Sequence, residues 1–188
     1  MFRESIYLDL KVICSVMIDA ASSEGKRTSL EEGDVLVSIT ADIGICSYID
    51  SSLDKPAFIN QHIALIRFNH AKINSKFIAY YLSSHQIQKL FKGSTDQGAK
   101  AGMNLDAVRM IKTALPTLQE QTAIANVLSD SDALIDALEQ LIAKKLAIKS
   151  ATMQQLLTGR TRLPAFALRP DGTKKGYKPS ELGEIPED

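Results

Sequence analysis

The stretch that most constrains the fold runs from Pro116 to Gly159, because neither glycine nor proline occurs between these two ends. Thr117 and Glu120 have the spacing of a capping box, which predicts that a helix begins beside Pro116. Gly159 is a favourable C-terminal stop, because glycine adopts the left-handed conformation without a Cβ penalty. A helix of about 40 residues is roughly 60 Å long, whereas helices in globular domains usually have three or four turns. Such a long helix needs a second element along much of its surface.

Apolar side chains recur along this predicted helix every seven residues and form a stripe wider than the seam of a two-stranded coiled coil. The stripe comprises Ile124, Val127, Leu128, Leu134, Ile135, Leu138, Leu141, Ile142 and Ile148. Periodicity alone fits the core helix of a single domain equally well. However, the preceding 115 residues contain no second helix of similar length that would cover the stripe. We therefore expect the stripe to pack against another long helix in a homodimer, and against a further protein.

Charge is unevenly distributed along the chain, although the formal net charge is +0. Residues 67–112 contain eight basic and two acidic side chains, and residues 144–178 contain nine basic and one acidic side chain. Residues 19–54 contain eight acidic and two basic side chains. This segregation favours a polyanionic partner, although an ordinary solvated surface also explains any single run.

Several features of the sequence favour a soluble cytoplasmic protein. Cys14 and Cys46 lie in apolar runs and are expected to be buried, reduced thiols. The N-terminus lacks the layout of a signal peptide, and the apolar run at residues 12–18 is too short to span a membrane. No membrane contact is expected.

Three β-rich runs precede the long helix. Residues 35–40 and 43–49 are predicted to form a hairpin, and residues 58–68 a third, central strand. Residues 110–115 are predicted to form a last strand. The expected fold class is α+β: a mixed α/β domain with a small twisted sheet over residues 1–115, one long coiled-coil-forming helix over 116–159, and an extended tail over 160–188. The tail contains four of the six prolines, which disfavours regular structure.

The remaining segments of the N-terminal domain are predicted to be helices and loops. Asn74 is predicted to cap a helix over about residues 76–92, and a second, short helix is predicted over 105–109. Residues 21–26 are predicted to be a loop. The glycine-rich segment 93–104 is a second predicted loop, of a kind that allows a backbone to approach a ligand closely.

The motifs of the common enzyme classes are absent from the sequence. No two prolines are adjacent, which excludes the Pro-Pro motif of amino-methyltransferases, and neither a dinucleotide-binding nor a phosphate-binding glycine loop occurs. The three histidines lack metal-site spacing relative to the cysteines. His62 lies in an apolar run and is expected to be a core histidine. We predict no catalytic residue, no metal site and no cofactor in this chain; an enzyme with an unrecognised centre remains an alternative.

The helical stretch also carries an ordered set of residues that resembles a known family. This set comprises Leu115-Pro116-Thr117-Leu118-Gln119-Glu120-Gln121, Ile124-Ala125, Leu128, Asp132, Ile135, Leu138, Lys149 and Gln154-Gln155-Leu156-Leu157-Thr158-Gly159-Arg160. It resembles the spacer helix of the specificity (S) subunit of type I restriction–modification systems. Looser matches upstream resemble the later part of a target-recognition domain: Glu32-Gly33-Asp34-Val35-Leu36, Ile43-Gly44, Gln61, Ala79-Tyr80-Tyr81-Leu82 and Asn104-Leu105.

The resemblance implies a role in a larger complex. An S subunit has two target-recognition domains, each reading one half of a bipartite DNA sequence, and two antiparallel spacer helices hold them apart. Methyltransferase (M) subunits bind S-adenosylmethionine, and restriction (R) subunits carry the nuclease, so S-adenosylmethionine, ATP and Mg²⁺ are expected in the partners. The S subunit is not catalytic. The expected partners of this chain are therefore double-stranded DNA and the M and R subunits.

This chain departs from the family pattern in having one recognition region and one spacer. Residues 176–188 resemble the opening of a recognition domain, but the family's following Trp is missing, since the chain has none. The chain therefore resembles a half-subunit in circularly permuted order. Two copies are expected to pair through antiparallel long helices, with each tail docking on a recognition domain. The alternative is a truncated coiled-coil interaction protein that does not read DNA.

Recognition of DNA divides into phosphate contacts, which position the protein, and base contacts, which specify the sequence. Lysine and arginine serve the first role, and hydroxyl and amide side chains serve the second. Turn formation and capping explain the same polar residues in the loop. The predicted DNA-binding residues are Ser38, Thr40, Lys72, Lys92, Ser94, Thr95, Gln97, Lys100, Asn104 and Arg109.

Overall fold

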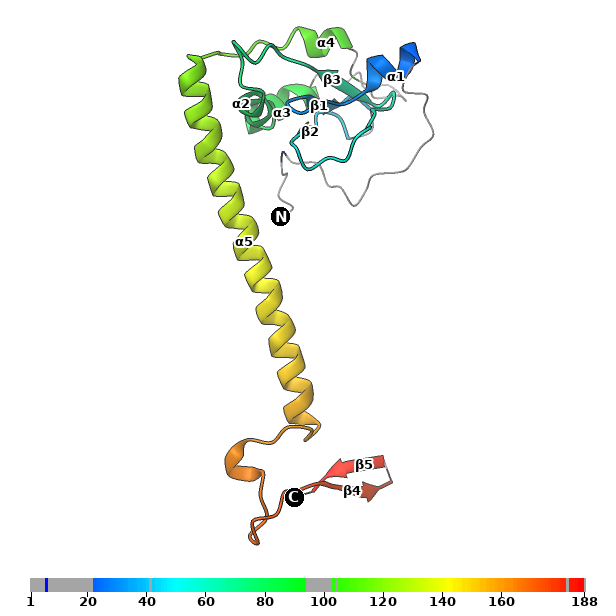
Figure 1. Ribbon diagram of the computed structural model, residues 1–188, viewed down its shortest axis with the longest axis vertical. Coiled ribbons are helices and arrows are strands. Elements are labelled where there is room, and N and C mark those ends of the chain that lie inside the picture. The colour runs from blue at the N-terminus through cyan, green and yellow to red at the C-terminus, as the bar shows by residue number, and fades with distance from the viewer. Residues whose placement is uncertain are drawn as a thin grey trace. The chain divides into compact units, whose positions relative to one another are not determined.

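The computed structural model describes residues 6, 22–40, 42–93, 103, 105–181 and 183–187, without the side chain of Lys92. The chain divides into two compact units, residues 1–132 (unit 1) and residues 133–188 (unit 2). The elements are α1 (Ser23–Thr28), β1 (Val35–Ser38), β2 (Cys46–Tyr48), β3 (Ile63–Ile66), α2 (Ser75–Leu82), α3 (His85–Gly93), α4 (Leu105–Arg109), α5 (Leu118–Leu157), the 3₁₀ turn η2 (Pro164–Phe166), β4 (Tyr177–Ser180) and β5 (Gly183–Pro186) (Figure 1). This content confirms the predicted α+β class and the long helix.

The sheet of unit 1 has the antiparallel order β2-β1-β3. The predicted hairpin is confirmed, since Val37 pairs with Cys46 and Val35 with Tyr48. The prediction of a central third strand is wrong, because β3 is short and is the outermost of the three strands that the structure describes in this sheet. Asn60 provides the reason. Its side-chain oxygen accepts the N–H of His62 at 3.0 Å, so residues 60–62 form a turn instead of extending the strand.

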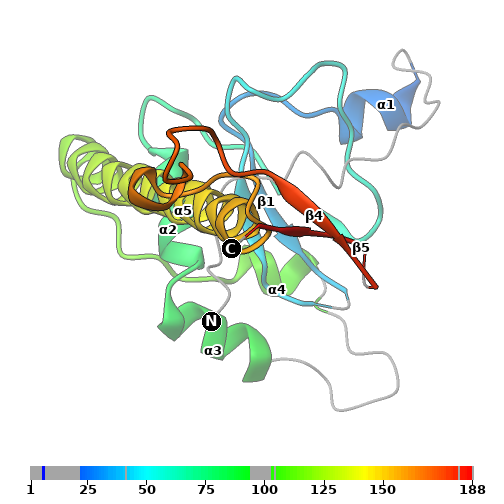
Figure 2. The same ribbon diagram turned by 90° about the horizontal axis from the view of Figure 1, so that it is seen from below.

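Both faces of the central strand β1 are covered. Val35 and Val37 have no exposed surface and pack in one cluster with the apolar side of α2. Leu36 points to the opposite face and packs in a second cluster with Leu30, Ile49 and Leu53. Side chains alternate across a strand, so β1 contributes to two cores. Figure 2 shows α2 and α3 on one side of the sheet.

The single helix predicted over residues 76–92 is two helices, α2 and α3. Its predicted cap is confirmed, because the Oδ1 atom of Asn74 accepts the N–H of Phe77 at 3.0 Å. Helix α2 ends at Leu82, and the Leu82 carbonyl accepts a hydrogen bond from Gln88 Nε2 at 2.9 Å. The break allows Ile87 and Phe91 to enter the core, where they are 6% and 3% exposed.

Two other local predictions are wrong, and one is confirmed. The sequence predicts a loop over residues 21–26, but α1 begins at Ser23 because Ser22 caps it, accepting the N–H of Gly25 at 2.9 Å; Ala21 lies outside the described residues. Residues 110–115 form no strand; the carbonyl of Lys112 instead accepts a hydrogen bond from the Tyr81 hydroxyl at 3.2 Å. The short helix α4 has the predicted bounds. Cys46 is buried as predicted, whereas Cys14 lies outside the described residues.

The long helix α5 contains 40 residues. Its predicted start is confirmed by Thr117, whose hydroxyl oxygen accepts the N–H of Glu120 at 3.3 Å. Within α5, Gln121 and Ala125 are buried. All nine residues of the predicted stripe are exposed, from 37% at Ile124 to 65% at Val127.

The predicted extended tail is wrong for residues 177–180 and 183–186, where β4 and β5 pair as antiparallel strands in unit 2. Within unit 2, the guanidinium of Arg169 donates hydrogen bonds of 2.7–3.1 Å to the carboxylate of Glu187 and so links the segment before β4 to the residue after β5. The N–H of Gly176 and the guanidinium of Arg169 lower the pKa of Glu187 below its ordinary value. Gly159 has a φ of 67°, which confirms the predicted helix stop. The hydroxyl of Tyr177 donates to the carbonyl of Thr158 at 2.9 Å and ties the hairpin to the helix end.

Candidate nucleic-acid interface

The turn that follows β1 presents the first predicted DNA-binding residue. The hydroxyl of Ser38 accepts the N–H of Ile45 at 2.9 Å and donates to the carbonyl of Asp42. Gly44, at a φ of 91°, lies so close to α3 that a Cβ there would be 2.6 Å from Phe91. The Nε2 atom of Gln88 also donates to the carbonyl of Gly44 at 2.6 Å. The backbone and α3 therefore hold this turn in place.

Thr40 lies in a chain of polar side chains at the same end of the sheet. Its hydroxyl is 2.8 Å from Nδ1 of His62, and Nε2 of His62 is 3.2 Å from Nε2 of Gln61. The expectation of a core histidine is wrong: His62 is exposed because it precedes β3, at the end of the sheet. Sequence reasoning did not select Gln61 and His62 as site residues, although consecutive polar residues directly before an apolar strand are a usable signal. Hydroxyl, imidazole and amide groups can all hydrogen-bond to base edges.

The predicted phosphate-binding cations lie on separate segments. Lys72 is exposed in the turn that follows β3. Arg109 ends α4 and contacts Asp106 at 2.9 Å, but both side chains are more than 70% exposed, so this ion pair leaves Arg109 accessible. Lys92 lies on α3. Five predicted residues fall outside the described part of the chain: Ser94, Thr95, Gln97, Lys100 and Asn104.

Arg67 belongs to the basic segment, but its guanidinium has a structural role. Asp34, which is 1% exposed, accepts hydrogen bonds from Nε and from a terminal nitrogen of Arg67 at 2.8 and 2.7 Å. Glu31 and the carbonyl of Ser29 accept two further bonds. The hydrogen bond to Asp34 is the main cause that raises the pKa of Arg67. This network joins the start of β1 to the end of β3.

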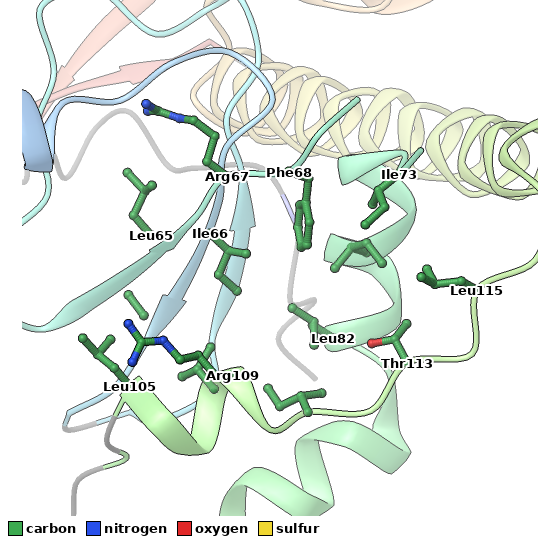
Figure 3. A pocket seen from close by; sticks show the side chains of 14 residues that line it. Leu65, Ile66, Arg67, Phe68, Ile73, Leu82, Leu105, Arg109, Thr113 and Leu115 are labelled. Carbon is green, nitrogen blue, oxygen red and sulfur yellow. The ribbon is translucent and has the colours of Figure 1, made fainter. Parts of the chain in front are cut away.

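A pocket of about 560 Å³ lies at the outer edge of β3 (Figure 3). Consecutive residues 64–68 line it, which places the pocket at the strand edge and not on one face. Side chains of α2 and α4, among them Ile78, Leu82 and Val108, complete the wall together with alternate residues of the segment that follows α4. The lining is mostly apolar, so the pocket itself offers few groups for a nucleic acid.

The described ranges contain neither a metal-binding group of three or more His, Cys, Asp or Glu side chains nor a helix long and apolar enough to cross a membrane.

The family model of the type I restriction modification DNA specificity domain matches residues 17–147. The chain belongs to this family. The specificity-domain match includes all of β1–β3 and α2–α4 and extends into α5, so the predicted resemblance is confirmed. Residues 148–188, including the hairpin of unit 2, lie beyond it.

Two curated relatives to which this chain is similar come from Methanocaldococcus jannaschii. The chain is 31% identical over 137 residues to the "Putative type I restriction enzyme MjaX specificity subunit". It is 29% identical over 141 residues to the "Type I restriction enzyme MjaVIII specificity subunit". Each alignment covers 71% of this chain but only 30% and 32% of the respective relative. The chain therefore spans about one third of the length of these relatives.

Proposed function

We propose that this chain is the DNA sequence-specificity subunit of a type I restriction–modification complex in the cytoplasm. The single observation that carries the proposal is the specificity-domain match over residues 17–147. In this role the chain reads one DNA half-site and positions the M and R subunits. It is not catalytic, and S-adenosylmethionine, ATP and Mg²⁺ are bound by the partner subunits.

The end of the sheet is the part of unit 1 that best suits base contacts. Thr40, Gln61 and His62 lie together there and present donors and acceptors to solvent. The major groove distinguishes all four base pairs by such groups. Lys72 and Arg109 are exposed cations that would contact phosphates. Predicted residues outside the described ranges, Gln97 among them, remain further candidates for this interface.

The apolar stripe on α5 supports a homodimer. Its nine residues are at least 37% exposed, although burial of a leucine or isoleucine side chain stabilises by about 1.5–3 kcal/mol. A second copy of α5 has the length and the apolar face to cover them. The same helix pair would form the docking surface for an M subunit, which explains a stripe wider than two helices need.

The charges of α5 favour an antiparallel pair. From Leu118 to Gln140 the helix has five acidic residues and no lysine or arginine, whereas from Leu141 to Leu157 it has three lysines and no acidic residue. Antiparallel packing places each acidic half beside a basic half. Parallel packing places like charges together, which is unfavourable. In the antiparallel dimer, each tail completes a recognition domain, a proposal that rests on the sequence of residues 176–188.

Salt-dependent DNA binding tests whether the chain binds a DNA half-site. Titration of the full chain with duplex DNA at several salt concentrations should give a log K that falls linearly with log salt. Lys72→Ala should reduce the slope by about one unit while leaving any base preference unchanged. Lys149→Ala, on the C-terminal part of α5, serves as a control with the same charge change. A truncated coiled-coil protein would bind duplex DNA weakly and without sequence preference.

Mapping methylated sites tests whether the chain directs an M subunit to one DNA sequence. Co-expression with an M subunit encoded beside this chain should give co-purification and methylation of one bipartite DNA sequence. A homodimer predicts a palindromic target, because the two half-sites are read by identical domains. An asymmetric target would refute the homodimer. Methylation or cleavage by the isolated chain with S-adenosylmethionine or Mg²⁺ would refute the non-catalytic role.

A further inference from the structure

A buried glutamine lies in the first turn of α5. Gln121 is 2% exposed, and both polar atoms of its amide have partners. Its Oε1 atom accepts the N–H of Asn74 at 2.9 Å, and its Nε2 atom donates to the carbonyl of Pro116 at 2.9 Å. Only this orientation of the amide satisfies both neighbours, because a backbone N–H requires an acceptor and a carbonyl requires a donor. The first turn of α5 is therefore fixed to the segment before α2.

Asn74 connects the two helices at this point. Its Oδ1 atom caps α2, its backbone N–H bonds to Gln121, and its Nδ2 atom donates to the hydroxyl of Thr122 at 3.2 Å. One residue thus sets the start of α2 and holds the start of α5. Of these residues only Gln121 is buried, whereas Asn74 is half-buried and Thr122 is exposed. Because both polar atoms of the buried Gln121 amide are hydrogen-bonded, this arrangement is favoured over alternatives that would leave one of them without a partner.

A second anchor lies farther along the same pair of helices. The hydroxyl of Tyr80, on α2, donates to Oδ2 of Asp132, on α5, at 2.8 Å. Asp132 is 11 residues beyond Gln121, which is about 16 Å along a helix. Between the two anchors, Ala125 is 1% exposed and packs in the main core cluster. Two separated hydrogen-bonded anchors define a direction, whereas one anchor would act as a pivot.

We propose that Gln121 is a positioning residue that, together with Asn74 and the Tyr80–Asp132 pair, fixes the direction in which α5 leaves the recognition sheet. The inference rests on the proposed function, since it gives this joint a role in selecting the gap between two half-sites. A swing of about 10° at one end of a helix roughly 60 Å long moves the other end by about 10 Å. That displacement corresponds to about three base pairs. A sharp preference for one gap therefore requires a stiff joint as well as a helix of fixed length.

The stiffness of the joint is measurable without DNA. Spin labels placed through Gln86→Cys on α3 and Ser150→Cys on α5, with both native cysteines replaced by alanine, report the distance between unit 1 and a point on α5 well beyond Asp132. Dilution with an excess of unlabelled chain leaves only distances within one copy. We expect a narrow distance distribution in the otherwise unchanged full chain and a broader one with Gln121→Met, which removes both hydrogen bonds and keeps a linear side chain. Gln119→Met, at an exposed position of the same turn, is the matched control and should leave the width unchanged.

A width that does not change with Gln121→Met overturns the proposal. If that variant fails to fold, Tyr80→Phe removes the second anchor by deleting one hydroxyl and should broaden the distribution. A narrow distribution with Tyr80→Phe is then the refuting result. A merely structural role would lower the folded fraction without widening the distribution of the folded molecules.

DNA with graded gaps tests the functional consequence. Duplexes carrying the selected half-sites at gaps that differ by single base pairs are titrated with the full chain. We expect the ratio of binding at the best gap to binding at its neighbours to fall toward equality with Gln121→Met, while the base preference within each half-site is retained. Unchanged gap selectivity refutes the role of the joint. Absence of sequence preference in the unsubstituted chain refutes the proposed function instead, and the spin-label result is unaffected.

Discussion

Replacing Arg67 by methionine should destabilise unit 1 strongly, although the arginine itself is partly exposed. The substitution keeps a long apolar side chain but removes both hydrogen bonds to Asp34. The carboxylate of Asp34 is 1% exposed and cannot recover these bonds from water without opening the start of β1. The cost is therefore that of leaving a buried charge without its counter-charge.

The magnitude follows from the burial of the two partners. Removing one member of a fully buried ion pair costs about 3–5 kcal/mol. Here the Arg67 side chain is 38% exposed, which weakens the pair by solvent screening. One oxygen of Asp34 also keeps the N–H of Glu31 at 2.7 Å. We therefore expect a loss of about 2–3 kcal/mol in the free energy of unfolding. Glu31→Gln keeps an oxygen that can accept from Arg67 and removes only the charge of this exposed partner, which should cost less than about 1 kcal/mol.

Urea unfolding followed by tyrosine fluorescence measures this difference. The chain has no tryptophan, and Tyr48, Tyr80 and Tyr81 lie in unit 1, so the signal reports mainly on that unit. Far-ultraviolet circular dichroism would instead be dominated by α5. The midpoint should shift while the slope stays constant. If Arg67→Met destabilises no more than Glu31→Gln, the buried ion pair is screened by water and the reasoning is wrong.

Three further predictions concern the tail and the long helix. Because hydrogen bonding to Gly176 and Arg169 lowers the pKa of Glu187, its contribution to hairpin stability should be complete above the ordinary glutamate pKa and lost as the pH falls through the lowered value. Cross-strand contacts measured by NMR across this range check it, and Glu187→Gln should reduce the dependence to the part contributed by Asp171, whose pKa is also lowered, chiefly by hydrogen bonds from Thr173. Replacing Leu134 and Leu141 together by glutamate should convert a dimer to monomers without loss of helix, since both side chains are exposed in the single chain. Light scattering measures the oligomeric state. An unsubstituted chain that is monomeric at micromolar concentration would contradict the dimer. Inserting four residues into the middle of α5 should lengthen the preferred gap by about two base pairs, at about 1.5 Å per residue and 3.4 Å per base pair, and an unchanged gap would show that the helix is not the ruler.

Features set by neighbours in the sequence were predictable, and features set by distant contacts were not. The caps at Asn74 and Thr117 and the stop at Gly159 depend on atoms within three or four residues, and all three are confirmed. The edge position of β3 depends on pairing with a strand some 30 residues earlier, which an apolar run cannot reveal. The break after Leu82 follows from the burial of Phe91, a tertiary preference that overrides a continuous helical pattern.

The same division applies to the candidate interface. Ser38 and Thr40 were selected because hydroxyl groups follow an apolar strand, which is a local pattern. The pairing of Thr40 with His62 joins residues 22 positions apart, and nothing near either residue predicts it. Arg67 belongs to a basic segment of the sequence, but its guanidinium is bound to Asp34, 33 positions away, which the segment itself does not reveal. A run of basic residues therefore indicates a DNA-binding surface only for those residues that are not paired with a buried acidic group, as Arg67 is.

In the β1–β2 turn, the residues that fix the backbone are different from the residue that is exposed to solvent at the tip. The hydroxyl of Ser38, the left-handed backbone of Gly44 and the side chain of Gln88 fix its path, whereas Asp42 at its tip is exposed. Substitutions at the tip meet solvent and leave the supporting contacts intact. A lineage of such chains could therefore change what the turn touches by point mutation, without a new fold and without a compensating change elsewhere. Divergence of targets among related chains would then be fast at the tip and slow beneath it.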